Sequence, residues 1–184
     1  MRVLIGCEFS ATVRRAFAAL GHEAWSCDLL PSEHTGPHLQ CDVRDVLHEG
    51  WDLGIFHPPC TYLANSGARW WATRQPEQRA ALAFVQTLLD APIARIALEN
   101  PEGRISTAIR KPDQLIHPWE YGEEEEKKTC LWLKGLPLLQ PTRLMARREQ
   151  RCWRMGQSTD RSRERSRTYP GIAEAMATQW GTAP

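Results

Sequence analysis

Short apolar runs alternate with amphipathic stretches through the first hundred residues. The runs at 3–5, 52–56 and 93–98 have the length and composition of buried strands, and 75–89 carries apolar side chains at helical spacing. Strands separated by helices favour a parallel sheet with right-handed crossovers. The pattern therefore predicts an α/β protein with one doubly wound sheet.

Local signals define the elements between these runs. Ser10 or Thr12 is expected to cap a helix that ends at Gly21. A second strand is predicted over 22–27, and a third short element ends at 41–45. The apolar stripe of the first helix is predicted to consist of Val13, Phe17 and Leu20.

The second half of the chain has a weaker pattern. Residues 103–121 include Pro112 and Pro118 and are expected to consist largely of loops, and 123–128 is expected to be a solvated charged stretch. A strand is predicted over 129–133. A closing helix is predicted over 169–180, with Ile172, Ala173, Met176 and Trp180 on one face.

The length of 184 residues is that of a single domain, 1–184. The net charge is only +1, so the whole chain has no general nucleic-acid signature. The charge is uneven, because 143–167 holds nine arginines against three acidic residues, a local balance of 9 − 3 = +6. We therefore expect 140–168 to be a basic insert or loop that could contact nucleic acid.

Six cysteines without a CxxC pair, and no signal peptide, favour reduced thiols in a cytoplasmic protein. No apolar run has membrane-spanning length, so no membrane association is expected. His34, His38 and Cys41 lie close together in sequence, but the Gly-Pro between the histidines indicates a loop. No metal site is predicted.

The stretch His57-Pro58-Pro59-Cys60 directly follows an apolar run. Two prolines fix φ and remove two backbone donors, which predicts a stiff, extended turn at the end of a strand. Ligands bind at that edge of an open α/β sheet. Cys60 is therefore either a candidate nucleophile or a structural thiol at a rigid turn.

Acidic side chains follow other predicted strands. Asp28 and Asp42 suit hydroxyl and amine donors such as those of a nucleoside, and Phe9 could lie against a flat ring. Glu99 follows the strand predicted next to that of Cys60. The loop after the first strand lacks GxGxxG, which disfavours a dinucleotide. Each Asp taken alone is more often a helix cap than a ligand-binding residue.

Taken in order, these residues resemble the S-adenosylmethionine-dependent cytosine-C5 DNA methyltransferases, and more closely a short phage-type branch of that family. The resemblance covers nearly the whole chain. The cofactor motifs are matched by Phe9-Ser10, by the acidic Asp28 and Cys41-Asp42-Val43-Arg44-Asp45, and by Tyr169 to Ala177. The nucleophile motif is matched by Pro58-Pro59-Cys60, and the Glu-Asn-Val motif by Glu99-Asn100-Pro101. The strand that touches the target nucleotide is matched by Thr129 to Gly135, preceded by Lys127-Lys128.

The resemblance implies S-adenosylmethionine as cofactor and DNA as partner, either a duplex with a flipped base or a single strand. Cys60 would attack C6 of cytosine, and Glu99 would act as the acid, best with a pKa raised by burial. The expected cofactor contacts are Phe9, Ser10, Asp28, Asp42 and Pro58. The expected substrate contacts are Asn100 and Lys128, with Arg163 and Arg165 added from the basic segment.

The chain departs from the family pattern in three respects. His57 replaces a glycine before the nucleophile motif, with either a polar or a packing role, and Thr61 replaces a glutamine after it. The separate target-recognition region has no counterpart. The basic segment, with Trp153 among its cations, is the expected substitute, and Arg163, Arg165 and Arg167 would share one side if extended. A homodimer or a partner subunit could also supply recognition.

Alternative functions stay open at this point. The motif is close to the Pro-Pro-Tyr of exocyclic amino methyltransferases, and Tyr62 lies near Cys60. A non-catalytic nucleic-acid-binding protein with the same fold is a further alternative, as is RNA or a free nucleotide as substrate. Trp70-Trp71 could stack on single-stranded nucleic acid or pack in the core.

Overall fold

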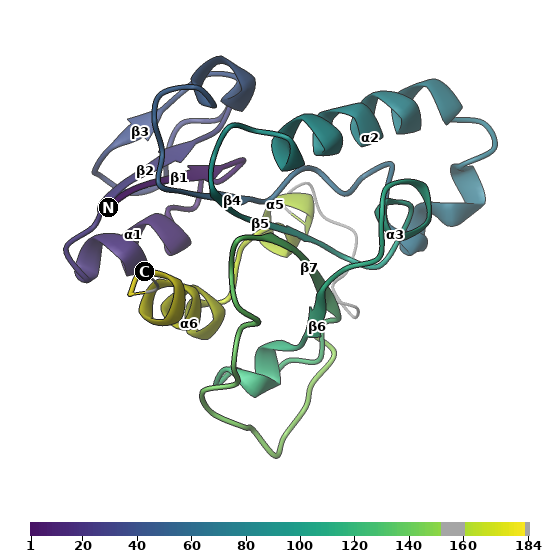
Figure 1. Ribbon diagram of the computed structural model, residues 1–184. Coiled ribbons are helices and arrows are strands. Elements are labelled where there is room, and N and C mark those ends of the chain that lie inside the picture. The colour runs from purple at the N-terminus through teal and green to yellow at the C-terminus, as the bar shows by residue number, and fades with distance from the viewer. Residues whose placement is uncertain (152–160, 183–184) are drawn as a thin grey trace.

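A mixed β-sheet of seven strands forms the centre of the molecule (Figure 1). The computed structural model describes residues 1–151 and 161–182. Within them the strand order is β3-β2-β1-β4-β5-β7-β6. The strands are β1 (Arg2–Gly6), β2 (Glu23–Cys27), β3 (His38–Leu39), β4 (Leu53–Phe56), β5 (Arg95–Asn100), β6 (Gln114–Ile116) and β7 (Thr129–Lys134).

The first five strands are parallel, as predicted from the alternation of strands and helices. Strand β7 is antiparallel to both β5 and β6, which the pattern did not predict. The carboxyl ends of the parallel strands meet at one edge of the sheet. Because β7 runs the opposite way, its first residues lie at that same edge, with Cys130 opposite Asn100.

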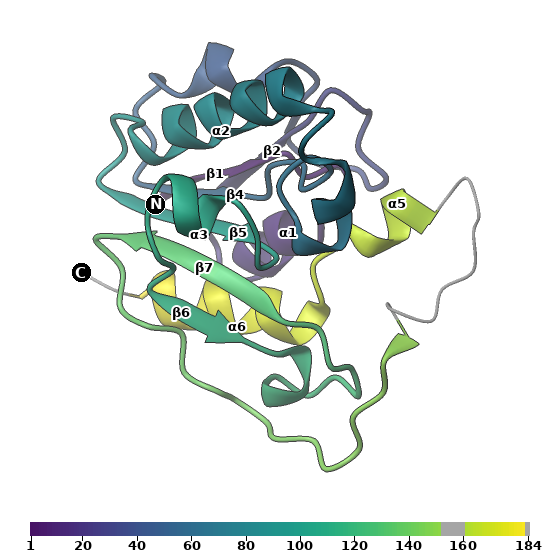
Figure 2. The same ribbon diagram turned by 90° about the vertical axis from the view of Figure 1, so that its right-hand side faces the viewer.

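Helices cover both faces of the sheet. Helices α1 and α6 lie together on one face, and α2 lies on the other (Figures 1 and 2). The helices are α1 (Thr12–Ala19), α2 (Gln75–Leu89), α3 (Ile105–Ala108), α5 (Arg161–Arg165) and α6 (Pro170–Trp180), and the short 3₁₀ turns are η1 (Val43–Val46), η2 (Asn65–Trp70) and η3 (Pro118–Glu120). The predicted bounds of α2 are confirmed, and those of α6 are confirmed to within one residue.

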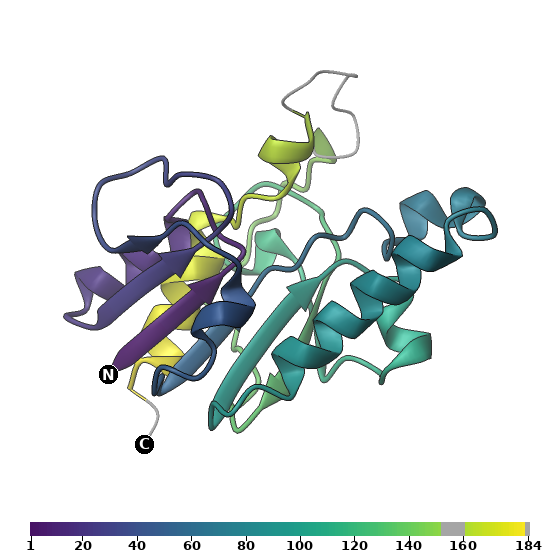
Figure 3. The ribbon, with the colours of Figure 1, turned by 90° about the horizontal axis from the view of Figure 1, so that it is seen from above.

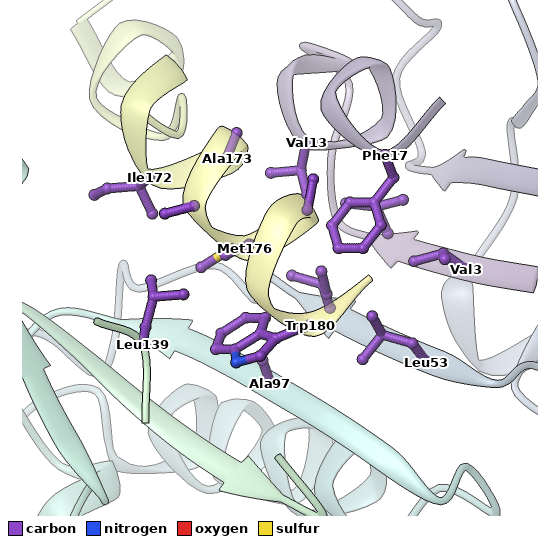
Figure 4. Packing of buried hydrophobic residues seen from close by; sticks show 14 of the residues in the cluster. Val3, Val13, Phe17, Leu53, Ala97, Leu139, Ile172, Ala173, Met176 and Trp180 are labelled. Atoms are coloured by element: carbon purple, nitrogen blue, oxygen red, sulfur yellow. The ribbon is translucent and has the colours of Figure 1, made fainter. Parts of the chain in front are cut away.

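The core on the α1 and α6 face follows the predicted apolar stripes (Figure 4). Val13 and Phe17 pack against Met176 and Trp180, and all four side chains are fully buried. The indole of Trp180 also donates a hydrogen bond to the Pro137 carbonyl at 3.0 Å. Leu20 is 51% exposed, so its place in the stripe was wrong, because α1 ends before it.

The cap of α1 also differs from the prediction. The carboxylate of Glu8 accepts the backbone N–H groups of Val13 at 2.6 Å and Arg14 at 3.2 Å. Glu8 thus fills the role expected of Ser10 or Thr12, since a buried carboxylate is favoured by the positive end of a helix. Sequence spacing did not reveal this because Glu8 lies four residues before the first helical residue.

Two predictions for the second half were wrong. The segment expected to be loops contains α3, β6 and η3, which are too short to give a periodic signal. The charged stretch expected to be solvated includes Glu125, whose side chain is 1% exposed. Its carboxylate accepts hydrogen bonds from the Arg151 backbone N–H at 3.1 Å and from Arg151 Nε at 3.3 Å.

No helix among the described residues is long and apolar enough to cross a membrane. The five cysteines that the structure describes are free thiols. Cys152 and Trp153 lie outside the described residues. Across 1–151 and 161–182, no group of three or more His, Cys, Asp or Glu side chains is arranged to hold a metal ion.

Candidate active site

The turn that carries Cys60 begins where β4 ends. The His57 N–H donates to the Gly6 carbonyl at 3.0 Å, which extends the pairing of β4 with β1 by one residue. Neither proline can donate, so the chain leaves the sheet there. The Cys60 carbonyl then accepts the N–H groups of Leu63 at 3.0 Å and Ala64 at 2.9 Å. Cys60 is therefore held at the strand edge, with its side chain exposed.

Residues 99 and 100 lie on β5, the neighbouring strand, rather than after it. Asn100 Nδ2 donates to the Pro58 carbonyl at 2.7 Å and fixes the proline turn to β5. In the described part of the chain, Asn100 Oδ1 is buried without a hydrogen-bond partner. Asn100 therefore connects the two strand ends that carry Cys60 and Glu99.

Glu99 is hydrogen-bonded to His57, the residue that replaces the family's glycine. His57 Nδ1 lies 3.2 Å from Glu99 Oε2, and the two side chains are 5% and 17% exposed. Burial acts to raise the pKa of Glu99. The hydrogen bond from His57 and the charge of Lys127 outweigh it, so the pKa lies below its ordinary value. The raised pKa under which Glu99 would act best as an acid is therefore not found in the structure.

The Cys60 thiol has the opposite tendency. Desolvation of the thiol by the surrounding residues raises its pKa above the ordinary value, and the negative charge of Glu99 raises the pKa further. The charges of Lys127 and Arg165 act to lower the pKa of Cys60 but do not outweigh these causes. The thiol is thus protonated near neutral pH, with a carboxylate and two cations acting on it.

His57 is close to a second carboxyl. Burial raises the pKa of Glu8, and the charge of His57 is the first influence that opposes it. His57 Nε2 is buried and has no hydrogen-bond partner in the described ranges. The imidazole therefore interacts electrostatically with both Glu8 and Glu99 at the ends of β1 and β5.

Two carboxylates and an aromatic ring lie around the end of β1. Burial raises the pKa of Cys7 to about 12, with contributions from the charges of Asp28 and Asp42, which places both carboxylates near this thiol. Asp28 Oδ1 accepts the Leu30 N–H at 2.9 Å. Phe9 is 8% exposed, and Ser10 beside it is buried.

Asp42 caps η1 and pairs with Arg44. Its Oδ1 accepts the Arg44 backbone N–H at 2.9 Å and Nε at 3.0 Å. The hydrogen bond from the Arg44 side chain holds the pKa of Asp42 below its ordinary value. A ligand amine at Asp42 would therefore share the carboxylate with this guanidinium.

Helix α5 lies beyond the carboxyl ends of β1 and β5 (Figure 3). The guanidinium carbons of Arg163 and Arg167 lie 4.9 and 5.8 Å from the Phe9 ring centroid, and both arginines pair with Glu33. Arg165 acts on Cys60 instead. The segment is helical over Arg161–Arg165, so the extended conformation in which the three alternate arginines would share one side is not adopted there.

The pair of lysines before β7 separates in the structure. Lys128 Nζ lies 3.5 Å from a Glu102 carboxylate oxygen. Lys127, which the resemblance includes but which was not among the expected substrate contacts, acts on both Glu99 and Cys60 and donates to the Arg165 carbonyl at 3.1 Å. The two adjacent lysine side chains have different partners. The sequence contained no signal that Lys127, and not Lys128, acts on the cysteine.

The described residues fit the cofactor that the resemblance implies. Asp28 and Asp42 offer carboxylate oxygens to hydroxyl and amine donors, and Phe9 provides an aromatic side chain at the same strand edge. Ala11 has φ +57°, the left-handed conformation that glycine adopts most readily, at the turn where the implied cofactor motif has glycines.

Comparison with solved structures finds a protein with a similar arrangement. It is described as a "putative DNA modification methyltransferase" encoded within a prophage of E. coli. The match has a TM-score of 0.53 and 14% sequence identity, and it covers 79% of this chain and 52% of that protein. This chain has a methyltransferase-type fold.

The chain thus spans about half the length of that methyltransferase-fold protein. No protein-family profile matches the sequence, and no curated protein matches it. At this identity the likeness concerns the fold, which agrees with the predicted α/β class.

Proposed function

We propose that this methyltransferase-fold protein transfers a methyl group from S-adenosylmethionine to C5 of cytosine in DNA, through a covalent adduct with Cys60. The observation that supports this most directly is the pairing of residues at the sheet edge. An exposed cysteine and a hydrogen-bonded glutamate lie on neighbouring strand ends, and the charge of Glu99 acts on the Cys60 thiol.

Cytosine C5 is a weak nucleophile and must be activated before it accepts a methyl group. Addition of the Cys60 sulfur to C6 forms an S–C bond and moves the ring electrons toward C5 and N3. The thiol loses one proton and N3 gains one, so this addition needs no net proton. Glu99 is the proposed group that holds the proton at N3 and accepts a hydrogen bond from the 4-amino group.

S-adenosylmethionine, when bound, would supply an electrophilic methyl group. Phe9, Ser10, Asp28, Asp42 and Pro58 are the residues that we propose to hold it. After methyl transfer, loss of the C5 proton to a base and departure of the Cys60 thiolate from C6 restore the aromatic ring. Glu99 passes the N3 proton to the departing Cys60 thiolate, which restores the thiol and the ionised Glu99 of the starting state.

The DNA would approach from the exposed side of Cys60. Asn100 and Lys128, from the resemblance, and Arg163 and Arg165, from the basic segment, are the proposed substrate contacts. Lys127 joins them because its charge acts on both Cys60 and Glu99. Cations beside the flipped base would compensate the phosphates that flank it.

The decisive experiment identifies the modified nucleoside. The protein is incubated with methyl-labelled S-adenosylmethionine and genomic DNA, the DNA is digested, and the nucleosides are separated. We expect label in 5-methylcytosine. Label in N4-methylcytosine or N6-methyladenine would contradict the C5 assignment and favour an amino methyltransferase. Absence of label with DNA, RNA and free nucleotides would favour a binding protein.

A second experiment tests the nucleophile. An oligonucleotide with 5-fluorocytosine is expected to form a stable adduct with the wild-type protein, and Cys60→Ala should abolish it. Cys130→Ala is the control, because Cys130 is buried on β7 and burial raises the pKa of its thiol to about 11. Adduct formation by Cys60→Ala would exclude Cys60 as the nucleophile.

A further inference from the structure

Aromatic rings and guanidinium groups are interleaved on the loop that follows Cys60. Arg69 and Arg74 place their guanidinium carbons 5.1 and 5.7 Å from the Trp70 ring centroid. Arg74 also lies 5.9 Å from the Tyr62 ring, and Arg104 lies 5.6 Å from the ring of Trp71. We call Tyr62, Arg69, Trp70, Trp71, Arg74 and Arg104 the aromatic–arginine platform.

The platform is on the surface. Trp70 is 47% exposed, an unusually large exposure for an indole, and Arg69 and Arg74 beside it are exposed as well. The segment that joins β4 to the amino end of α2 lies at the outer end of that helix, away from α1 (Figures 1 and 3). Trp70 therefore does not belong to the core and presents a large apolar ring to solvent.

The platform arginines are free of carboxylate partners in the part of the chain that the structure describes. Within the described ranges, Arg69, Arg74 and Arg104 form no ion pair. Four arginines of the basic segment do: Arg147 pairs with Glu124 and Glu149, Arg151 pairs with Glu125 and Glu149, and Arg163 and Arg167 pair with Glu33. The platform therefore offers three guanidinium groups to an external anion without an ion pair that must first be broken.

The backbone connects the platform to both candidate catalytic strand ends. Leu63 and Ala64 donate to the Cys60 carbonyl, and Arg104 donates its N–H to the Leu63 carbonyl at 2.8 Å. Asn65 donates to the Glu102 carbonyl at 2.9 Å. A molecule held by the platform would thus contact the same rigid loops that position Cys60 and Glu99.

A hollow of about 380 Å³ lies beside Trp71, bordered by Gln78, Arg79 and Arg104. Trp71 Nε1 is buried without a hydrogen-bond partner in the part of the chain that the structure describes. Arg79, like the platform arginines, forms no ion pair among those residues. The hollow adds room and donors for an anionic group beside Trp71.

We propose that the platform binds single-stranded DNA that flanks the target cytosine. Trp70 would stack against an unpaired base, and Arg69, Arg74 and Arg104 would contact phosphates. Stacking on an exposed ring requires bases that are not paired in a duplex, which favours a single strand. That the strand is DNA rests on the proposed function.

The test measures binding without catalysis. A fluorescein-labelled single-stranded DNA is titrated with Cys60→Ala protein, which isolates binding from methyl transfer, and Kd is compared with that for the matching duplex. We expect the single strand to bind more tightly and Trp70→Ala to weaken binding by at least about fivefold. The double variant Arg69→Gln/Arg74→Gln should lower the slope of log K against log salt by about 1.4.

Matched controls are Trp119→Ala, at a ring with a guanidinium carbon 3.8 Å from its centroid, and Arg15→Gln, at an exposed position on α1. Both should leave Kd within about twofold, with thermal melting confirming that every variant is folded. Equal or tighter duplex binding, tighter RNA binding, or an unchanged Kd in Trp70→Ala would each overturn the proposal. Because methyl transfer is not measured, these results are independent of whether the C5 assignment holds.

Discussion

His57 connects chemistry that the sequence placed far apart. The imidazole interacts with the carboxyl groups of two residues at different strand ends, Glu8 just after β1 and Glu99 on β5. Its Nδ1 hydrogen bond keeps a largely buried carboxyl ionised against the effect of burial. We infer that His57 is a positioning residue, since it fixes the orientation of the Glu99 carboxylate.

Replacement of His57 should change how stability depends on pH. The folded pKa of Glu99 lies below its ordinary value, so Glu99 stabilises the fold above its unfolded pKa, and this stabilisation is lost as the pH falls through the folded pKa. In His57→Ala burial would dominate and raise the pKa of Glu99. We expect urea unfolding at pH 7 to show a loss of about 1–3 kcal/mol.

The loss in His57→Ala should become smaller as the pH falls from the unfolded pKa of Glu99 through its lower folded pKa, below which the carboxyl is protonated in both states. His48→Ala, at an exposed position, is the control and should change stability by less than about 0.5 kcal/mol. A constant loss across the whole pH range would mean that His57 contributes through packing alone.

Ala11 stores backbone strain at the turn before α1. Its φ of +57° lies in the left-handed region, which costs an L-residue with a Cβ about 1–2 kcal/mol. Ala11→Gly should therefore stabilise the protein by about 1 kcal/mol, as measured by the urea midpoint at constant m-value.

A glycine substitution elsewhere should have the opposite sign. Ala80 is exposed in the interior of α2, where Ala80→Gly is expected to cost about 1 kcal/mol. Destabilisation by both substitutions would show that the left-handed conformation at Ala11 carries no strain that glycine relieves.

The loops after β4 and β5 depend on a close approach of two backbones. Residues 64 and 103 form an isolated antiparallel bridge, and a Cβ on Gly103 would lie 1.9 Å from the Leu63 carbonyl oxygen. Gly103→Ala must therefore separate the Cys60 loop from the Glu99 strand. We expect a loss of about 1–3 kcal/mol in unfolding free energy and a clear fall in methyl transfer or cofactor-dependent adduct formation.

Gly67 provides the matched control in the same loop. A Cβ there would lie 3.4 Å from the Thr61 carbonyl oxygen, an ordinary contact. Gly67→Ala should change stability by less than about 0.5 kcal/mol and preserve the adduct. Equal effects of the two substitutions would mean that the approach of residues 63 and 103 is not required.

The predicted elements were confirmed where a long periodic pattern exists. Helices α2 and α6 and strands β1, β2, β4, β5 and β7 all appear near their predicted positions. Strand β6 and helix α3 were missed because three or four residues carry no measurable period. The antiparallel direction of β7 could not be predicted, because β-strand patterning is the same in both directions.

Tryptophans serve two different purposes in the molecule as a whole. Trp180 is fully buried between α6 and the sheet, whereas Trp70 is 47% exposed. Trp180→Ala should cost about 3–5 kcal/mol in urea unfolding, because it leaves a large cavity and an unpaired Pro137 carbonyl. Trp70→Ala should cost less than about 1 kcal/mol.

Similar losses of unfolding free energy in the two variants would contradict the distinction between a core tryptophan and a surface tryptophan. They would also contradict the placement of Trp70 on a binding surface. The two residues have the same side chain, so their different surroundings alone account for the expected difference. The sequence left open whether Trp70 packs in the core or stacks on a ligand, since burial depends on neighbours from distant parts of the chain.

By itself, the sequence determined the α/β class and the residues that could perform the chemistry, because periodicity, proline geometry and side-chain reactivity are local properties. The tertiary structure decided the state and partners of those residues. It lowered the pKa of Glu99 through His57 and brought Lys127, rather than Lys128, to Cys60. It also paired Arg163 of the basic segment with Glu33. These outcomes depend on distances between segments remote in sequence, and electrostatic interactions follow those distances.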